Sequence, residues 1–127
     1  MRLTVPALSI LLAAALAFPA CGGGGFHASQ PEVQRAIDGL EVVRKAAKDG
    51  DVEGAKAAFE NARGPIQVVA NLVKPVDAEM AADLEGMILH LDSHFETGGN
   101  APHIVVTVED FQRMLEEAGN ALKGPKQ

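Results

Sequence analysis

The sequence predicts an all-α fold, an antiparallel up-down four-helix bundle that follows a signal peptide and a glycine-rich tether. Apolar residues recur at three- and four-residue steps in four segments, which is the period of an amphipathic helix. Glycine or proline separates these segments, so the connections are short. The length of 127 residues allows one ordinary domain, and we place the bundle at residues 31–123.

The first predicted helix runs from Pro31 to Lys48. Ser29-Gln30-Pro31-Glu32 fits a capping box with proline near the first helical position. Gly50 ends the helix. The solvated face should carry Glu41, Lys45 and Lys48. The apolar stripe consists of Val33, Ala36, Ile37, Leu40, Val43 and Ala47.

The second predicted helix runs from about Asp51 to Lys74 and contains Gly64-Pro65. The apolar stripe keeps its phase across this pair, so we expect one helix kinked at Pro65. The alternative is two short helices that meet at Gly64. The stripe consists of Val52, Ala55, Phe59, Ala62, Ile66, Val69, Ala70 and Val73.

Two further helices complete the predicted bundle. Asp77 caps a third helix that reaches about Thr97, and Gly98-Gly99 end it. We expect residues 100–106 to form a loop whose Ile104-Val105-Val106 run packs over a bundle end. Thr107 should then cap a fourth helix to about Leu122, followed by a frayed tail at 124–127. The expected inward positions are Leu84, Met87, Ile88, Leu91, Phe95, Phe111, Met114, Leu115, Ala118 and Leu122.

Residues 1–20 have the features of a signal peptide, with Arg2 before an apolar stretch at 3–18. Cys21 is the only cysteine, so the chain forms no internal disulfide. The segment resembles a bacterial lipoprotein signal, although Phe18 and Pro19 depart from that pattern. The resemblance implies an acyl chain such as palmitate on Cys21 and a flexible tether over 21–30. Simple cleavage that leaves a free thiol is the alternative.

The charge balance limits the classes of partner. The net charge is −6, and loss of the signal peptide leaves ten basic against 17 acidic residues, or −7. An acidic surface argues against nucleic acid and against docking on anionic headgroups. We therefore expect membrane attachment through the lipid alone, an envelope protein as a possible partner, and a monomer or weak self-association. By the same resemblance, Gly22 after the cysteine favours the outer membrane, facing the periplasm, in a Gram-negative cell.

A metal site is predicted on the third helix. His90 and His94 are four residues apart, so both imidazoles lie on one helical face. The same stripe passes through Asp83, and His103 can approach from beyond the glycine turn. Nitrogen and oxygen ligands together suit zinc, copper, nickel or iron. The alternative is a pair of surface histidines on a solvated helix.

Other chemistry is not indicated. The chain has no Cys-x-x-Cys-His motif for covalent haem, and Leu91 stands where a zinc-hydrolase helix carries glutamate. No acid, base and nucleophile converge in the sequence, so we expect no enzyme. Met80, Met87 and Met114 are expected to fill the core.

Residues 46–70 resemble the imelysin-like family of exported helical bundles, several of them lipoproteins linked to iron uptake. The resemblance lies in Ala46-Ala47-Lys48-Asp49-Gly50-Asp51, in the alanine-rich stretch 55–63 and in 66–70. The family's Gly-x-His-x-x-Glu motif is absent: Gly86 precedes His90 by four residues, and Ser93 stands in the place of the glutamate. The resemblance implies an envelope bundle with a metal-related role and supplies no site residue.

These observations predict an envelope lipoprotein whose bundle binds or delivers a transition metal through the His-x3-His helix. The alternative is a structural or protein-interaction lipoprotein with neither metal nor catalytic activity. That alternative requires an exposed apolar patch, which we expect around residues 104–106.

Overall fold

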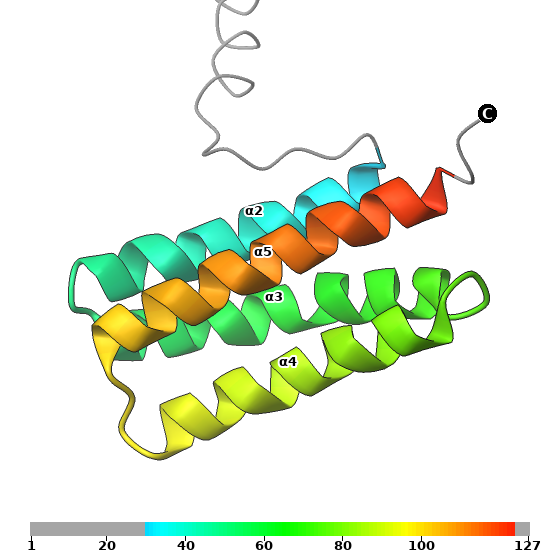
Figure 1. Ribbon diagram of the computed structural model, residues 1–127. Helices are drawn as coiled ribbons and strands as arrows, with labels where there is room; N and C mark the ends of the chain where they lie inside the picture. Colours follow the sequence, from blue (N-terminus) through cyan, green and yellow to red (C-terminus); the bar gives the residue numbers. More distant parts are fainter. Residues whose placement is uncertain (1–29, 124–127) are drawn as a thin grey trace, which may run out of the picture.

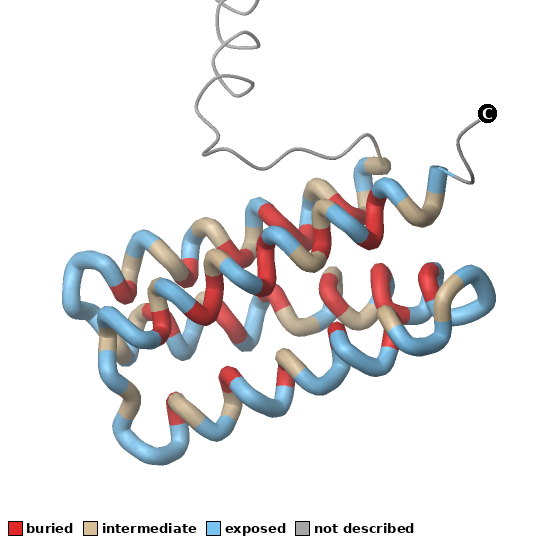
Figure 2. Tube along the Cα trace, viewed as in Figure 1, coloured by how far each residue is buried: buried red, intermediate tan, exposed pale blue. Residues whose placement is uncertain are grey.

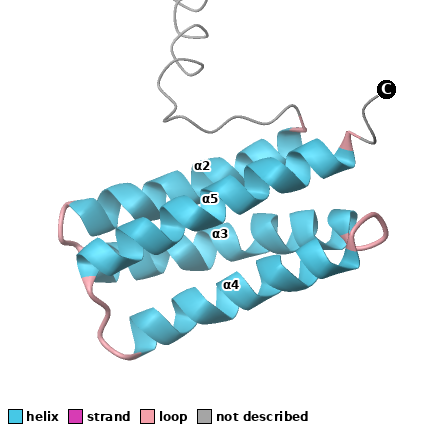
Figure 3. Ribbon diagram, in the orientation of Figure 1, coloured by secondary structure: helices cyan, strands magenta, loops and turns pink. Residues whose placement is uncertain are grey.

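The computed structural model describes residues 30–123, and this part of the chain is an all-α antiparallel bundle (Figures 1 and 3). Its helices are α2 (Pro31–Lys48), α3 (Val52–Val73), α4 (Ala78–Glu96) and α5 (Ala101–Leu122). The predicted fold class is therefore confirmed. The signal peptide, Cys21, residues 22–29 of the tether and the tail at 124–127 lie outside the described residues. The N-cap of α2 is Gln30 and not the predicted Ser29, and the Gln30 side chain makes no capping hydrogen bond.

Each helix turns one apolar stripe toward its neighbours, and these stripes form the core (Figure 2). The predicted positions of α2 are all buried. In α3 the predicted stripe is also buried, except that Val52 is half-buried. Met80, Met87 and Met114 pack against the core and keep part of their surface exposed. The helical period of the sequence thus identified the inner face of the bundle.

Helix α3 runs continuously through Pro65, as predicted. Proline removes one backbone hydrogen-bond donor from a helix. The neighbouring Ile66 is buried, so burial of the stripe on both sides of Pro65 holds the helix together across this position. Two short helices meeting at Gly64 are excluded.

The predicted start of the last helix was wrong. Residues 101–106 are not a loop: α5 begins at Ala101, and Asn100 caps it by accepting a hydrogen bond from the His103 amide at 3.0 Å. Thr107 does not cap the helix but lies buried within it. Ile104 is fully buried, so it extends the inner stripe of α5 and draws this first turn into the bundle. The consequence is that His103 stands on a helix.

Glu41 also departs from its prediction. Lys45 and Lys48 are exposed as expected, but Glu41 is half-buried between α2 and α5. It accepts hydrogen bonds from Arg44 at 2.6 Å and from the buried Gln112 at 3.2 Å. The hydrogen bond from Arg44 lowers the pKa of Glu41, and burial opposes this effect.

The helices do not pack equally tightly. Helix α2 packs most extensively on α3 and α5, while α4 packs chiefly on α3 and less on α5. At the α2–α3 contact, a Cβ on Gly39 would lie only 3.0 Å from the Ala62 Cβ, so glycine permits a close approach of the two helices. Among the helices of residues 30–123, none combines the length and apolarity of a membrane span.

Candidate metal centre

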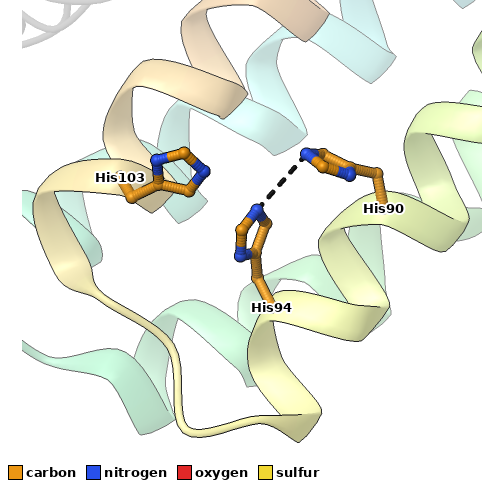
Figure 4. Close-up of side chains that lie close together, drawn as sticks. All are labelled: His90, His94 and His103. Atoms are coloured by element: carbon orange, nitrogen blue, oxygen red, sulfur yellow. Dashed lines mark hydrogen bonds between the residues drawn. The ribbon is translucent and has the colours of Figure 1, made fainter.

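Three histidines from two helices meet where α4 ends and α5 begins (Figure 4). His90 and His94 project from α4, and His103 projects from the first turn of α5. One ring nitrogen of each residue lies within 4.8 Å of the others. The His94 ring lies edge-on to both neighbours, with centroid distances of 4.6 Å to His90 and 4.4 Å to His103.

The two histidines of α4 are already at a distance that suits the binding of one metal ion. Their Nε2 atoms are 3.3 Å apart. A zinc ion bound at 2.0–2.1 Å with tetrahedral angles would hold two nitrogens about 3.3–3.4 Å apart. The helical spacing of four residues therefore brings this pair to the separation that coordination requires.

The turn between the helices brings His103 to the pair. Gly98 and Gly99 have positive φ angles of 92° and 46°, a conformation that glycine adopts without steric cost. A Cβ on Gly99 would lie 3.3 Å from the His94 carbonyl oxygen and 3.0 Å from Ile104 Cδ1. The turn is thus packed against both helices. Together with the Asn100 cap, it fixes His103 beside His94.

The surroundings of His94 favour its neutral form. His94 is half-buried, whereas His90 and His103 are exposed. Loss of hydration on burial lowers the pKa of His94, and the charges that His103 and His90 would carry lower it further. Because a metal binds the neutral imidazole, this environment favours the protonation state that coordination needs.

Asp83, which the sequence placed on the same stripe, is not part of the histidine group. It precedes His90 by seven residues, which at 1.5 Å per residue is about 10 Å along the helix axis. Asp83 is exposed and lines a separate hollow of about 290 Å³ between α4 and α5, with Met80, Met114 and Glu117 among its other walls. The donor set is therefore three nitrogens without a carboxylate.

An ion pair beside the histidine group was not predicted from the sequence. Arg63 of α3 donates two hydrogen bonds to Asp92 of α4, at 2.9 and 2.5 Å. The guanidinium also lies 5.2 Å from the centre of the Phe59 ring. The hydrogen bond to Asp92 raises the pKa of Arg63. Since Asp92 lies between the two histidines in sequence, this pair holds the same stretch of α4 against α3.

The arrangement can hold one divalent ion and leave coordination positions free. Three protein ligands on a tetrahedral ion leave a fourth position for water or an external donor. The exposure of His90 and His103 means that such a donor can approach from solvent. A metal ion held by these three nitrogens would thus be accessible from solvent.

Comparison with family models, with curated proteins and with solved structures found no match. The resemblance to the imelysin-like family and the lipoprotein assignment therefore stay predictions that rest on the residues quoted above. What the structure adds is an all-α bundle with a three-histidine group at one of its ends.

Proposed function

We propose that this protein is an envelope lipoprotein, anchored through Cys21, whose helical bundle binds a divalent transition metal ion through His90, His94 and His103. The convergence of the three imidazoles at the junction of two helices is the observation that carries the proposal. The exposed location of the group suits capture and delivery, because a donor on another molecule can reach the ion.

The donor set narrows the choice of metal. Imidazole suits zinc, copper, nickel and iron, but the familiar non-haem iron(II) site also includes a carboxylate. Asp83 is remote from the histidine group, and within the described residues this group contains no carboxylate. We therefore place zinc, copper(II) and nickel ahead of iron(II).

The alternative, a protein-interaction lipoprotein without a metal, has less support. Ile104, at the centre of the expected patch, is buried in the core, although Val106 is 55% exposed. The other exposed large apolar residues come from α2, α3, α4 and the turn after α3, and exposed apolar residues are ordinary on a protein surface. They are Val42, Val68, Leu72, Val76 and Leu89.

Calorimetric titration of the full chain tests the proposal. The protein is purified in detergent without a histidine tag and titrated with zinc, copper(II), nickel and iron(II). We expect binding of one equivalent of zinc, copper(II) or nickel, weaker binding of iron(II), and loss of measurable binding when all three histidines are replaced by alanine. Circular dichroism should show that the triple variant stays helical, because the three side chains contribute little to the core.

The fourth histidine supplies a matched control. His27 lies in the predicted tether and is not among the three proposed ligands, so His27→Ala should bind as the unmodified chain does. If the unmodified chain binds these ions no more tightly than the triple variant, the metal function is wrong. The interaction-lipoprotein alternative would then take its place.

A further inference from the structure

The two edges of α4 are attached differently. Toward α3, α4 is held by the Arg63–Asp92 pair and by a hydrogen bond from Gln67 to Glu85 at 3.0 Å. Toward α5, its packing is less extensive. Within the described residues, no side-chain hydrogen bond or ion pair joins α4 to α5. Apart from the Gly98-Gly99 turn that connects them, only apolar packing and the histidine group bring α4 and α5 together.

The three histidines lie on this weakly joined edge. Two potential ligands belong to α4 and the third belongs to α5, and Figure 4 shows the His103 ring of α5 directed toward the two rings of α4. An ion that used all three nitrogens would therefore add coordinate bonds where the fold provides no polar contact of its own.

We propose that the bound metal acts as a clasp, meaning a link between His90 and His94 of α4 and His103 of α5 that fixes α4 against α5. This inference rests on the proposed metal-binding function and adds a structural consequence to it. Any opening that separates the helices removes the His103 ligand and weakens binding. By linkage, the ion must then favour the closed arrangement in proportion to that loss of affinity.

Amide hydrogen exchange, followed by mass spectrometry on peptides of the full chain in detergent, tests the clasp. The probe is zinc at about 100 times its dissociation constant, measured against a chelator. Exchange that proceeds through separation of α4 from α5 should slow by up to about 100-fold, because the open form loses the ion. We expect this slowing both in the second half of α4, residues 86–96, and in the first turns of α5, residues 103–107.

His103→Ala is the matched variant, because it keeps the helical pair on α4 and removes the ligand on α5. At zinc saturation, determined by titration of the variant itself, we expect slower exchange only within α4. Slowing at 103–107 in the unmodified chain and not in this variant supports the clasp. Equal behaviour of residues 103–107 in both proteins, with zinc bound to both, overturns the clasp and leaves the metal function standing. Absence of zinc binding to the unmodified chain overturns both.

Discussion

At the scale of single residues, His94 links the site to the stability of the fold. Its pKa is lowered, mainly by burial, from an unfolded-state value of about 6.5. The unfolded chain therefore takes up this proton more readily than the folded chain. Stability should fall as the pH drops through about 6.5, and the loss from His94 should level off below its folded pKa.

Thermal unfolding measured by circular dichroism between pH 8 and pH 5, with a chelator present, checks this prediction. The melting temperature of the unmodified chain should decline over that range. His94→Gln keeps a polar side chain at the position and removes the titrating group, so its decline should be shallower. An equal decline in both proteins would show that His94 does not contribute.

The pairing of His90 with His94 within one helix could be predicted from the sequence. Which residues from elsewhere in the chain join this pair could be predicted only in outline. The His90–His94 pair follows from helical spacing alone, and the structure places its nitrogens 3.3 Å apart. Asp83 shares that stripe, but the rise of the helix carries it about 10 Å away. The sequence therefore identified the helical face that carries the two candidate ligands His90 and His94, but it overestimated how far along the helix axis the candidate site extends.

At the scale of elements, the start of α5 shows how burial overrides local preference. Residues 104–108 are Ile-Val-Val-Thr-Val, and β-branched residues lose side-chain freedom in a helix. Local propensity therefore favoured a loop up to Thr107. Burial of Ile104, Thr107 and Val108 on one face stabilises the helix instead. Asn100 with Pro102 in the first turn was the available sign of an earlier start.

The starts of α3 and α4 could be predicted because the cap residues and the apolar period agree there. The side chains of Asp51 and Asp77 each accept a hydrogen bond from the backbone amide of the residue three positions later in the chain, as N-cap residues do. The phase of the stripe also settled the path through Pro65. The pairing of Arg63 with Asp92 could not be inferred, because it depends on how α3 and α4 pack.

The attachment of α4 to α3 yields a prediction for Arg63→Ala. The pair is bidentate but partly exposed, with side-chain exposures of 34% and 27%, so its contribution should lie between those of surface and buried charged contacts. We expect a loss of about 1 kcal/mol in the free energy of unfolding, including the contact with Phe59. A loss of that size should lower the melting temperature by about 4–8 °C in a domain of this size.

Arg113→Ala is the matched control for the same measurement. Arg113 pairs with Asp110 on its own helix, with exposures of 55% and 56%, and its removal should change stability by less than about 0.5 kcal/mol. Arg63→Lys should recover only part of the loss, because lysine lacks the planar fork that binds both carboxylate oxygens. Equal effects of the two alanine substitutions would mean that the Arg63–Asp92 pair adds nothing to the fold.

At the scale of the whole molecule, the antiparallel topology separates the two proposed functional features. Helix α2 starts at one end of the bundle, and the chain reaches the other end at the close of α2 and again at the close of α4 (Figure 1). The histidines lie at this second end. The 18 residues of α2 span about 27 Å. A tether that enters at Pro31 therefore joins the bundle far from the histidine group.

This separation makes the lipid anchor and the metal site independently testable. In the proposed form, Cys21 carries acyl chains, each of which adds about 0.8 kcal/mol of membrane affinity for every buried methylene. Expressed in a bacterium that processes lipoproteins, the chain should partition into the detergent phase, and mass spectrometry should find the mature N-terminus at an acylated Cys21. Cys21→Ser should abolish acylation, since the sequence has no other cysteine.

After release from the membrane by limited proteolysis within 22–30, the bundle should bind zinc with the affinity of the anchored form, because the histidines lie at the far end. An unmodified Cys21 in the mature protein would refute the anchor, whereas a change in zinc affinity on release would refute the independence of the two features.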